Sequence, residues 1–172
     1  LMQACDTVIT CLPSPAACTA VMEQMLPEMV PGKTWIEMST TDASEVRRLA
    51  EQVNAVGAEA VECPVSGGCH RADTANISIF AGCSRPVFER VLPLLTLMGR
   101  RVLHTGDLGS ASILKVMTNY LATANLLTVC EALVTMKAAG LDLATTYEAI
   151  KISSGTSFVH ETESQVILSG SR

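Results

Sequence analysis

Aromatic residues are scarce in this chain, with three Phe, two Tyr and one Trp among 172 residues. Charged residues are also few, at 17%, and Lys and Arg form no basic run. The scarcity of aromatics predicts an aliphatic core, and the low charge argues against disorder. Because the net charge is −5, we expect neither nucleic acid nor an anionic membrane surface as a partner.

The cysteines lack the spacing of a disulfide or metal framework. All seven are scattered, their number is odd, and no C-x-x-C pair occurs, so we expect reduced thiols and a cytoplasmic protein. Cys63, Cys69, His70 and Cys83 match no common ligand spacing, and no metal is expected. No segment free of polar residues is long enough to cross a membrane, so we expect no membrane span, and we expect no signal peptide.

Strands alternate with helices in the first two thirds of the chain. Short β-branched or apolar runs predict five strands, at residues 7–12, 34–38, 58–62, 77–81 and 102–103. Apolar residues at helical spacing predict helices at residues 15–25, after Asp42 and at residues 87–98. This alternation predicts an α/β fold, with part of a Rossmann-type, doubly wound and largely parallel sheet over residues 1–106.

The pattern changes to helices alone after Gly106. Between residues 108 and 139 only Gly109 interrupts an apolar spacing of three to four residues, which predicts one long helix that Gly140 ends. A second helix is predicted at residues 143–153, and a polar segment follows it to the end of the chain. Residues 107–172 are therefore expected to begin an all-helical domain.

Small and hydroxyl residues follow three of the predicted strands. The loops are Leu12-Pro13-Ser14, Ser39-Thr40-Thr41 and the segment P-V-S-G-G at residues 64–68. In open α/β sheets ligands bind beyond the carboxyl ends of the strands, and such residues let a ligand approach the backbone. The alternative is that these loops are ordinary turns with helix caps.

Lys115 stands early in the long helix, on a strip of apolar residues. Asn119 follows four positions later, so both side chains project from one face. The positive end of the helix dipole and partial desolvation both favour a neutral lysine. These are the conditions for proton exchange near neutral pH. The alternative is a surface lysine whose ammonium group reaches the solvent.

Four motifs together resemble the β-hydroxyacid dehydrogenases, which include 3-hydroxyisobutyrate dehydrogenase, tartronate semialdehyde reductase and 6-phosphogluconate dehydrogenase. The motifs are D-T-V-I-T-C-L-P-S at residues 6–14, E-M-S-T-T-D at 37–42, P-V-S-G-G at 64–68 and K-x-x-x-N at 115–119. They occur in the family's order, and the separation of the last two also matches. The resemblance covers essentially the whole chain.

The resemblance implies a role for each motif residue. Leu12, Pro13 and Thr40 would contact the cofactor, and Ser66, Gly67 and Gly68 would bind the substrate. Lys115 would be the general acid/base, with Asn119 beside it. The implied reaction is hydride transfer between NAD or NADP and a small 3-hydroxy acid or semialdehyde acid, without a metal. The implied assembly is a homodimer or homotetramer.

The chain also departs from the family pattern. The G-x-G-x-x-G loop, the residue that selects NAD or NADP, and the C-terminal helices are missing. We therefore read the chain as truncated at both ends and expect the fragment itself to be inactive, because the pyrophosphate loop supplies much of cofactor binding. Ala75 stands where relatives commonly have Gly. Arg71 is bulkier than usual, and it either binds a second carboxylate or phosphate or is solvated.

Two other functions are compatible with parts of the pattern. The first is an imine reductase on the same scaffold, although those relatives commonly lack a lysine at the position of Lys115. The second is a non-catalytic helical assembly module whose α/β half is only structural. The combination of Ser66, Gly67 and Gly68 with Lys115 and Asn119 argues against both.

Overall fold

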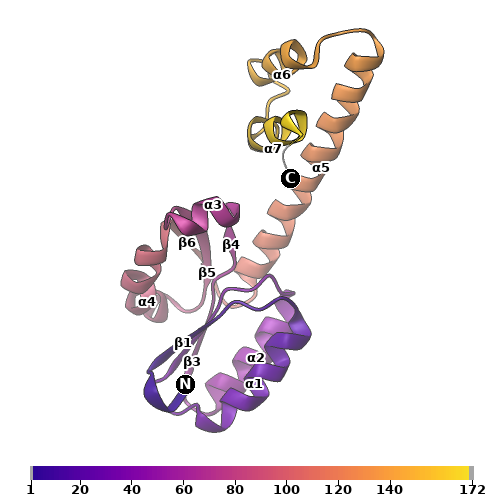
Figure 1. The fold of residues 1–172 in the computed structure, drawn as a ribbon. Coiled ribbons are helices and arrows are strands. Elements are labelled where there is room, and N and C mark those ends of the chain that lie inside the picture. The colour runs from indigo at the N-terminus through magenta and orange to yellow at the C-terminus, as the bar shows by residue number, and fades with distance from the viewer. Residues whose placement is uncertain (1, 171–172) are drawn as a thin grey trace. The chain divides into compact units, whose positions relative to one another are not determined.

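The computed structural model describes residues 2–170, with every side chain among them except that of His70. In chain order its elements are η1 Met2–Ala4, β1 Thr7–Thr10, α1 Pro15–Met25, η2 Leu26–Glu28, β2 Thr34–Glu37, α2 Ala43–Ala55, β3 Glu59–Glu62, β4 Val65–Ser66, α3 Gly68–Asp73, β5 Ile77–Gly82, α4 Arg85–Met98, β6 Gly99–Gly106, α5 Ser110–Ala138, α6 Leu143–Lys151 and α7 Phe158–Ser169 (Figure 1). Two compact units divide within α5, one ending at Val116 and the other beginning at Met117.

The first unit is an α/β unit built on one six-stranded sheet with the order β1-β2-β3-β5-β4, and β6 pairs with β5. The pairs β1·β2, β2·β3 and β5·β6 are parallel, whereas β5 runs antiparallel to β3 and β4. The predicted α/β class with a mostly parallel sheet is therefore confirmed. The reversal at β5 was not predicted.

The reversal arises in the P-V-S-G-G segment, which the sequence indicated as a tight loop. Instead, Val65 and Ser66 form β4 and pair antiparallel with Ile79 and Ser78 of β5. The pairing of Glu62 with Gly82 has the same register, so β4 continues the line of β3 past the end of its parallel neighbours. Two residues carry no measurable periodicity, which explains why this strand could not be recognised.

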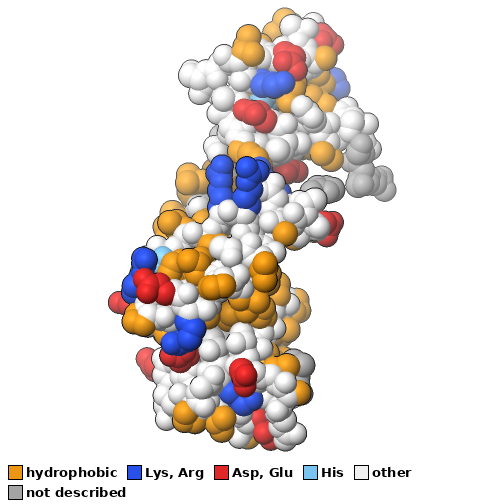
Figure 2. Space-filling model, turned by 90° about the vertical axis from the view of Figure 1, so that its left-hand side faces the viewer, with side chains coloured by type: hydrophobic (Ala, Val, Ile, Leu, Met, Phe, Trp, Pro, Cys, Tyr) orange, Lys and Arg blue, Asp and Glu red, His pale blue; other side chains and the backbone are white. Residues whose placement is uncertain are grey.

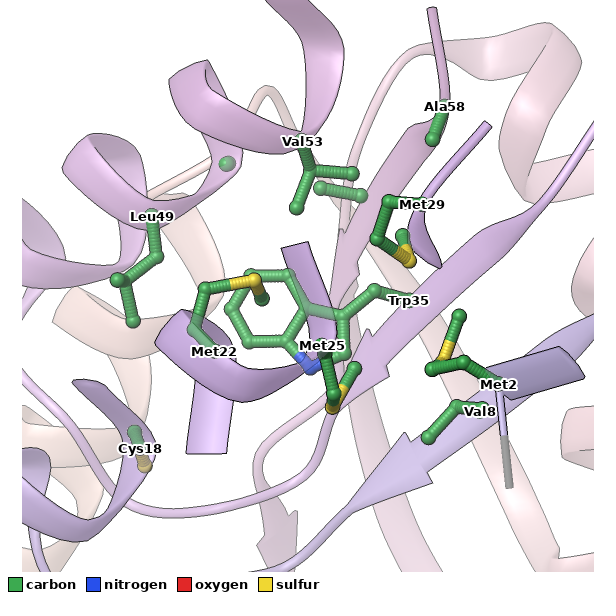
Figure 3. Packing of buried hydrophobic residues seen from close by; sticks show 12 residues of the cluster. Met2, Val8, Cys18, Met22, Met25, Met29, Trp35, Leu49, Val53 and Ala58 are labelled. Carbon is green, nitrogen blue, oxygen red and sulfur yellow. The ribbon is translucent and has the colours of Figure 1, made fainter. Parts of the chain in front are cut away.

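Each face of the sheet carries a buried core, and consecutive residues of the fully buried strand β2 belong to different cores. Trp35 points into a cluster under α1 and α2, where its ring lies among Met22, Met25 and Leu49 (Figure 3). The next residue, Ile36, belongs to the cluster under α4. This alternation follows from the period of two in a strand. Burial of each large apolar side chain contributes about 1.5–3 kcal/mol to folding.

The second unit contains α6 and α7, and α7 corrects the sequence reading of residues 154–172 as a polar segment. Ser157 caps α7 by accepting a hydrogen bond from the N–H of His160. His160 is fully buried; its Nδ1 lies 3.1 Å from Ser164 Oγ and its Nε2 lies 3.0 Å from the carbonyl oxygen of Tyr147. The buried side of α7 therefore includes polar groups that satisfy one another, so its sequence lacks a clear apolar stripe.

Helix α5 is the one described helix that is long and apolar enough to cross a membrane, a property the sequence reading did not register. Lys115 and Glu131 lie within it, and ionisable groups are costly inside a bilayer. On the face of the described chain shown in Figure 2, acidic and basic side chains are interspersed among apolar and neutral ones.

Ala75 has a left-handed backbone, with φ of 51°, and it is the one non-glycine residue with positive φ in the described chain. A left-handed conformation costs an L-residue roughly 1–2 kcal/mol. Glycine avoids this cost, but its larger entropy in the unfolded state offsets part of the gain in stability. Ala75→Gly is expected to raise the free energy of unfolding by about 0.5–1 kcal/mol, measured by urea denaturation. The control Ala20→Gly, on the exposed side of α1, should lower it by about 1 kcal/mol. Equal effects of the two changes would contradict the prediction.

Candidate active site

Three parallel strands end in one row at one edge of the sheet. Thr10 of β1 pairs with Glu37 of β2, and Glu37 pairs with Glu62 of β3. We call this the carboxyl edge. The segments that leave it are the three loops singled out from the sequence. The structure therefore confirms that these loops begin side by side at the edge where α/β proteins bind ligands.

A buried carboxyl group shapes the second of these loops. Glu37 is only 2% exposed; its Oε2 accepts a hydrogen bond from Thr10 Oγ1 at 2.6 Å, and its Oε1 accepts one from the Ser39 N–H at 2.6 Å. Thr10 Oγ1 in turn accepts from Trp35 Nε1 at 2.8 Å. The sequence analysis placed Glu37 in the E-M-S-T-T-D motif but gave it no role, although an acidic residue at the end of an apolar strand is a usable signal.

Leu12 joins the first loop to the second. Its N–H donates a hydrogen bond of 2.7 Å to Ser39 Oγ, while Pro13 and Thr40 are exposed. Thr41 Oγ1 is buried beside the Cys18 thiol. Two adjoining loops with exposed side chains fit a bound cofactor with polar groups.

A second buried carboxyl group connects the sheet to α5. Glu62 is 1% exposed, and its Oε1 accepts a hydrogen bond from the N–H of Ala111 at 2.8 Å. Its Oε2 accepts two from Ser112, at 3.2 Å from the N–H and at 2.6 Å from Oγ. The first turn of α5 is thereby fixed to the end of β3. The sequence analysis gave this residue no role either.

Small and apolar groups surround the Glu62 carboxyl group. A Cβ atom on Gly82 would lie 2.2 Å from Glu62 Oε1, so only glycine fits opposite it. Burial raises the pKa of the Cys63 and Cys83 thiols, that of Cys83 to about 11, and the nearby Glu62 adds to both shifts. These thiols therefore stay protonated and inert. No group of three metal-ligating side chains forms within the part of the chain that the structure describes.

Lys115 follows Ala111 by one helical turn, and it is buried. Its exposed fraction is 8%, whereas its apolar neighbours Leu114 and Val116 are 42% and 48% exposed. Burial lowers the pKa of the Lys115 ammonium group. This burial contradicts the alternative of a solvent-exposed lysine. Asn119, one turn further on, is exposed and belongs to the second unit.

The predicted substrate loop presents backbone groups. Ser66 is half-buried and held in β4, whereas Gly67 and Gly68 have φ of 136° and 72°, which favour glycine. A Cβ atom on Gly67 would lie 2.7 Å from Arg71 Cδ, so the side chain of Arg71 passes over this glycine. At Gly68 the space that a Cβ atom would take is open, so the backbone there can be approached by an anion.

Comparisons with known proteins agree with this geometry. Residues 1–106 match the family model of the NAD binding domain of 6-phosphogluconate dehydrogenase. Residues 109–172 match the model of the NAD-binding region of NADP-dependent 3-hydroxyisobutyrate dehydrogenase. A 2-(hydroxymethyl)glutarate dehydrogenase of Eubacterium barkeri is 32% identical over 171 residues, which cover 97% of this chain and 57% of that protein.

Solved structures give the same result. A Mycobacterium tuberculosis 3-hydroxyisobutyrate dehydrogenase determined with L-serine matches with a TM-score of 0.86 and 25% identity, over 91% of this chain and 54% of that one. An imine reductase from Myxococcus stipitatus, determined with NAD+, shares the fold at a TM-score of 0.80 and 18% identity, over 98% and 57%. The chain thus spans a little over half the length of these relatives. It belongs to the β-hydroxyacid dehydrogenase family of NAD(P)-binding oxidoreductases, to which the 3-hydroxyisobutyrate dehydrogenases also belong.

Proposed function

We propose that this protein transfers hydride between NAD(P) and a small 3-hydroxy acid or semialdehyde acid, with Lys115 as the general acid/base. The supporting observation is that Lys115 is buried although the apolar residues beside it, Leu114 and Val116, are exposed. Its helix α5 is hydrogen-bonded to Glu62 at the carboxyl edge. When bound, the nicotinamide accepts or donates the hydride. A metal ion is not needed in this scheme, because the lysine supplies the polarising positive charge.

The proton is handled by the chain itself. In oxidation, neutral Lys115 accepts the proton of the substrate hydroxyl group as hydride leaves the same carbon. In reduction, the Lys115 ammonium group returns a proton to the carbonyl oxygen. The lowered pKa that burial gives Lys115 makes both forms accessible nearer neutral pH. In this proposal Asn119 orients the substrate oxygen.

The substrate carboxylate is assigned to the P-V-S-G-G segment. Ser66 offers a hydroxyl group on a strand held in register, and Gly67 and Gly68 offer backbone N–H groups. Leu12, Pro13 and Thr40 are assigned to the cofactor, on the two loops that the Leu12–Ser39 hydrogen bond joins. The names of the relatives, which refer to hydroxy acids, support this class of substrate.

The two other functions receive no specific support. The likeness to imine reductases lies at 18% identity and shows the fold alone. A structural module would not need a lysine buried at the start of a helix whose apolar neighbours are exposed. We therefore keep the hydroxy-acid reaction and the family's homodimer or homotetramer as the proposal.

The reaction is tested with the full-length protein that carries this chain. Oxidation of NADH and NADPH is followed with succinic semialdehyde, glyoxylate, tartronate semialdehyde and methylmalonate semialdehyde. We expect turnover of at least one acid by the full-length protein and none by the 172-residue chain alone. Cofactor binding without turnover of any of them would overturn the assignment of the substrate class.

Arg71 is expected to select substrates that carry a second anionic group. Its side chain lies against Gly67, and a charged hydrogen bond contributes about 1.5–3 kcal/mol. Arg71→Ala should therefore raise KM for a dicarboxylate or phosphorylated acid by roughly 10- to 100-fold and leave KM for a monocarboxylate nearly unchanged. Arg71→Lys serves as the control, because it keeps the charge but not the planar fork. Equal increases for both substrate classes would show that Arg71 only supports the loop.

A further inference from the structure

We infer that Glu62 is a positioning residue for Lys115: its carboxylate fixes the first turn of α5 to the end of β3 and so sets the lysine against the substrate segment. The inference rests on the proposed function of Lys115. Glu62 precedes Pro64 by two residues, while its partners Ala111 and Ser112 precede Lys115 by four and three. One side chain thus links the start of the substrate segment to the start of the lysine helix.

The cap of α5 differs from the other caps of the described chain. Helices α1, α2, α6 and α7 each receive a side-chain cap from the residue just before them. Helix α5 instead receives three hydrogen bonds to Glu62, which lies 49 and 50 residues away from its partners. A local residue would satisfy the free N–H groups equally well. A distant cap additionally fixes where the helix begins.

The packing around Glu62 leaves this side chain little freedom. Gly82 stands opposite Oε1 with no space for a methyl group. The protonated thiols of Cys63 and Cys83 lie close by, and Arg47 Nε donates a hydrogen bond to the carbonyl oxygen of Leu108 before the helix. Asp107, which is exposed, precedes α5, and His104 Nε2 lies 2.8 Å from the carbonyl oxygen of Cys83. Glu62 is the group among them that binds the first turn.

The test compares Glu62→Gln with Glu37→Gln. Glu37 is the matched control, because it is equally buried in the same row of the carboxyl edge but bonds to Thr10 and Ser39. The glutamine at position 62 presents an amide N–H₂ group to an N–H donor, so the first turn loses one bond. In the full-length protein Glu62→Gln should lower kcat by about 10²-fold, the effect of a displaced catalytic group.

The second readout is the titration of Lys115, followed by NMR of its side chain in the 172-residue protein. Loosening the first turn should raise the pKa of Lys115 toward its ordinary value, because burial is what lowers it. It should also speed hydrogen exchange of the Ala111 and Ser112 amides. Glu37→Gln should leave both signals in place. Ser112→Ala, which removes one of the three bonds, should act in the same direction and more weakly if Glu62→Gln fails to fold.

The outcomes separate the two proposals. If Glu62→Gln moves neither the titration nor the exchange, or if Glu37→Gln moves both equally, the positioning role is wrong. If the titration moves as expected while the unmutated full-length protein converts no hydroxy acid, the positioning role stands and the proposed reaction fails. If kcat falls with an unchanged Lys115 titration and unchanged exchange, Glu62 acts on the reaction by another route and the inference is overturned.

Discussion

Lys115→Ala lowers kcat of the full-length protein by about 10²–10⁴-fold, the usual contribution of a positioned general acid/base. We expect cofactor affinity to change little, because the residues assigned to the cofactor lie on the loops after β1 and β2. The measurement is steady-state oxidation of the hydroxy acid together with a separate cofactor titration. A mutant that retains full turnover would assign the proton transfer to another residue.

The rates of oxidation and reduction are expected to change in opposite directions with pH. Oxidation needs neutral Lys115, so its rate should rise as pH increases through the pKa of this residue. Because burial lowers that pKa, the rise should come at a lower pH than the ordinary lysine value of about 10.4. Reduction needs the ammonium form and should fall over the same range. The control Lys115→Arg keeps the charge but cannot lose its proton at these pH values, so its residual oxidation should not rise with pH.

Gly82→Ala is expected to lower the free energy of unfolding by about 3 kcal/mol. The added methyl group would lie 2.2 Å from Glu62 Oε1 and 2.8 Å from Glu62 Cγ. The carboxyl group must then move, and its hydrogen bonds to Ala111 and Ser112 weaken. Overpacking alone typically costs 1–3 kcal/mol, and a buried polar group left without its partner adds to that cost.

Urea denaturation of the 172-residue protein measures this loss. Gly155→Ala is the control, since its added Cβ atom would meet only Ser153 Oγ, at 3.4 Å, and its backbone requires no glycine. We expect the control to change the free energy of unfolding by less than about 0.5 kcal/mol, as at most surface positions. Similar losses at the two positions would mean that Glu62 moves aside without penalty.

The elements that could be predicted are those whose ends and faces are marked in the sequence. Pro15 opens α1 and Asp42 caps α2, as expected, because proline suits the first turn and an aspartate accepts from free N–H groups. Helix α7 could not be predicted, because its buried side includes His160 and Ser164 rather than an apolar stripe. The partner of His160 in α6, the carbonyl oxygen of Tyr147, is known only from the packing of α6 against α7.

For the site, residues on the loops after the strands could be found, because parallel strands end at a shared edge. The hydrogen bonds that hold those loops in place could not be found from the sequence. Glu37 and Glu62 look like ordinary acidic residues at strand ends, and their partners are set by register and by a helix far along the chain. Sequence motifs therefore indicated candidates for the reaction, and the structure added the two carboxyl groups that place them.

The distant cap of α5 also has a consequence for the order of folding. Contacts between residues about 50 positions apart close a long loop and form slowly compared with local turns. The first turn of α5 can be completed only after β3 and β5 have brought Glu62 and Gly82 together. Because burial in the folded structure is what lowers the pKa of Lys115, its altered proton affinity depends on the assembled sheet.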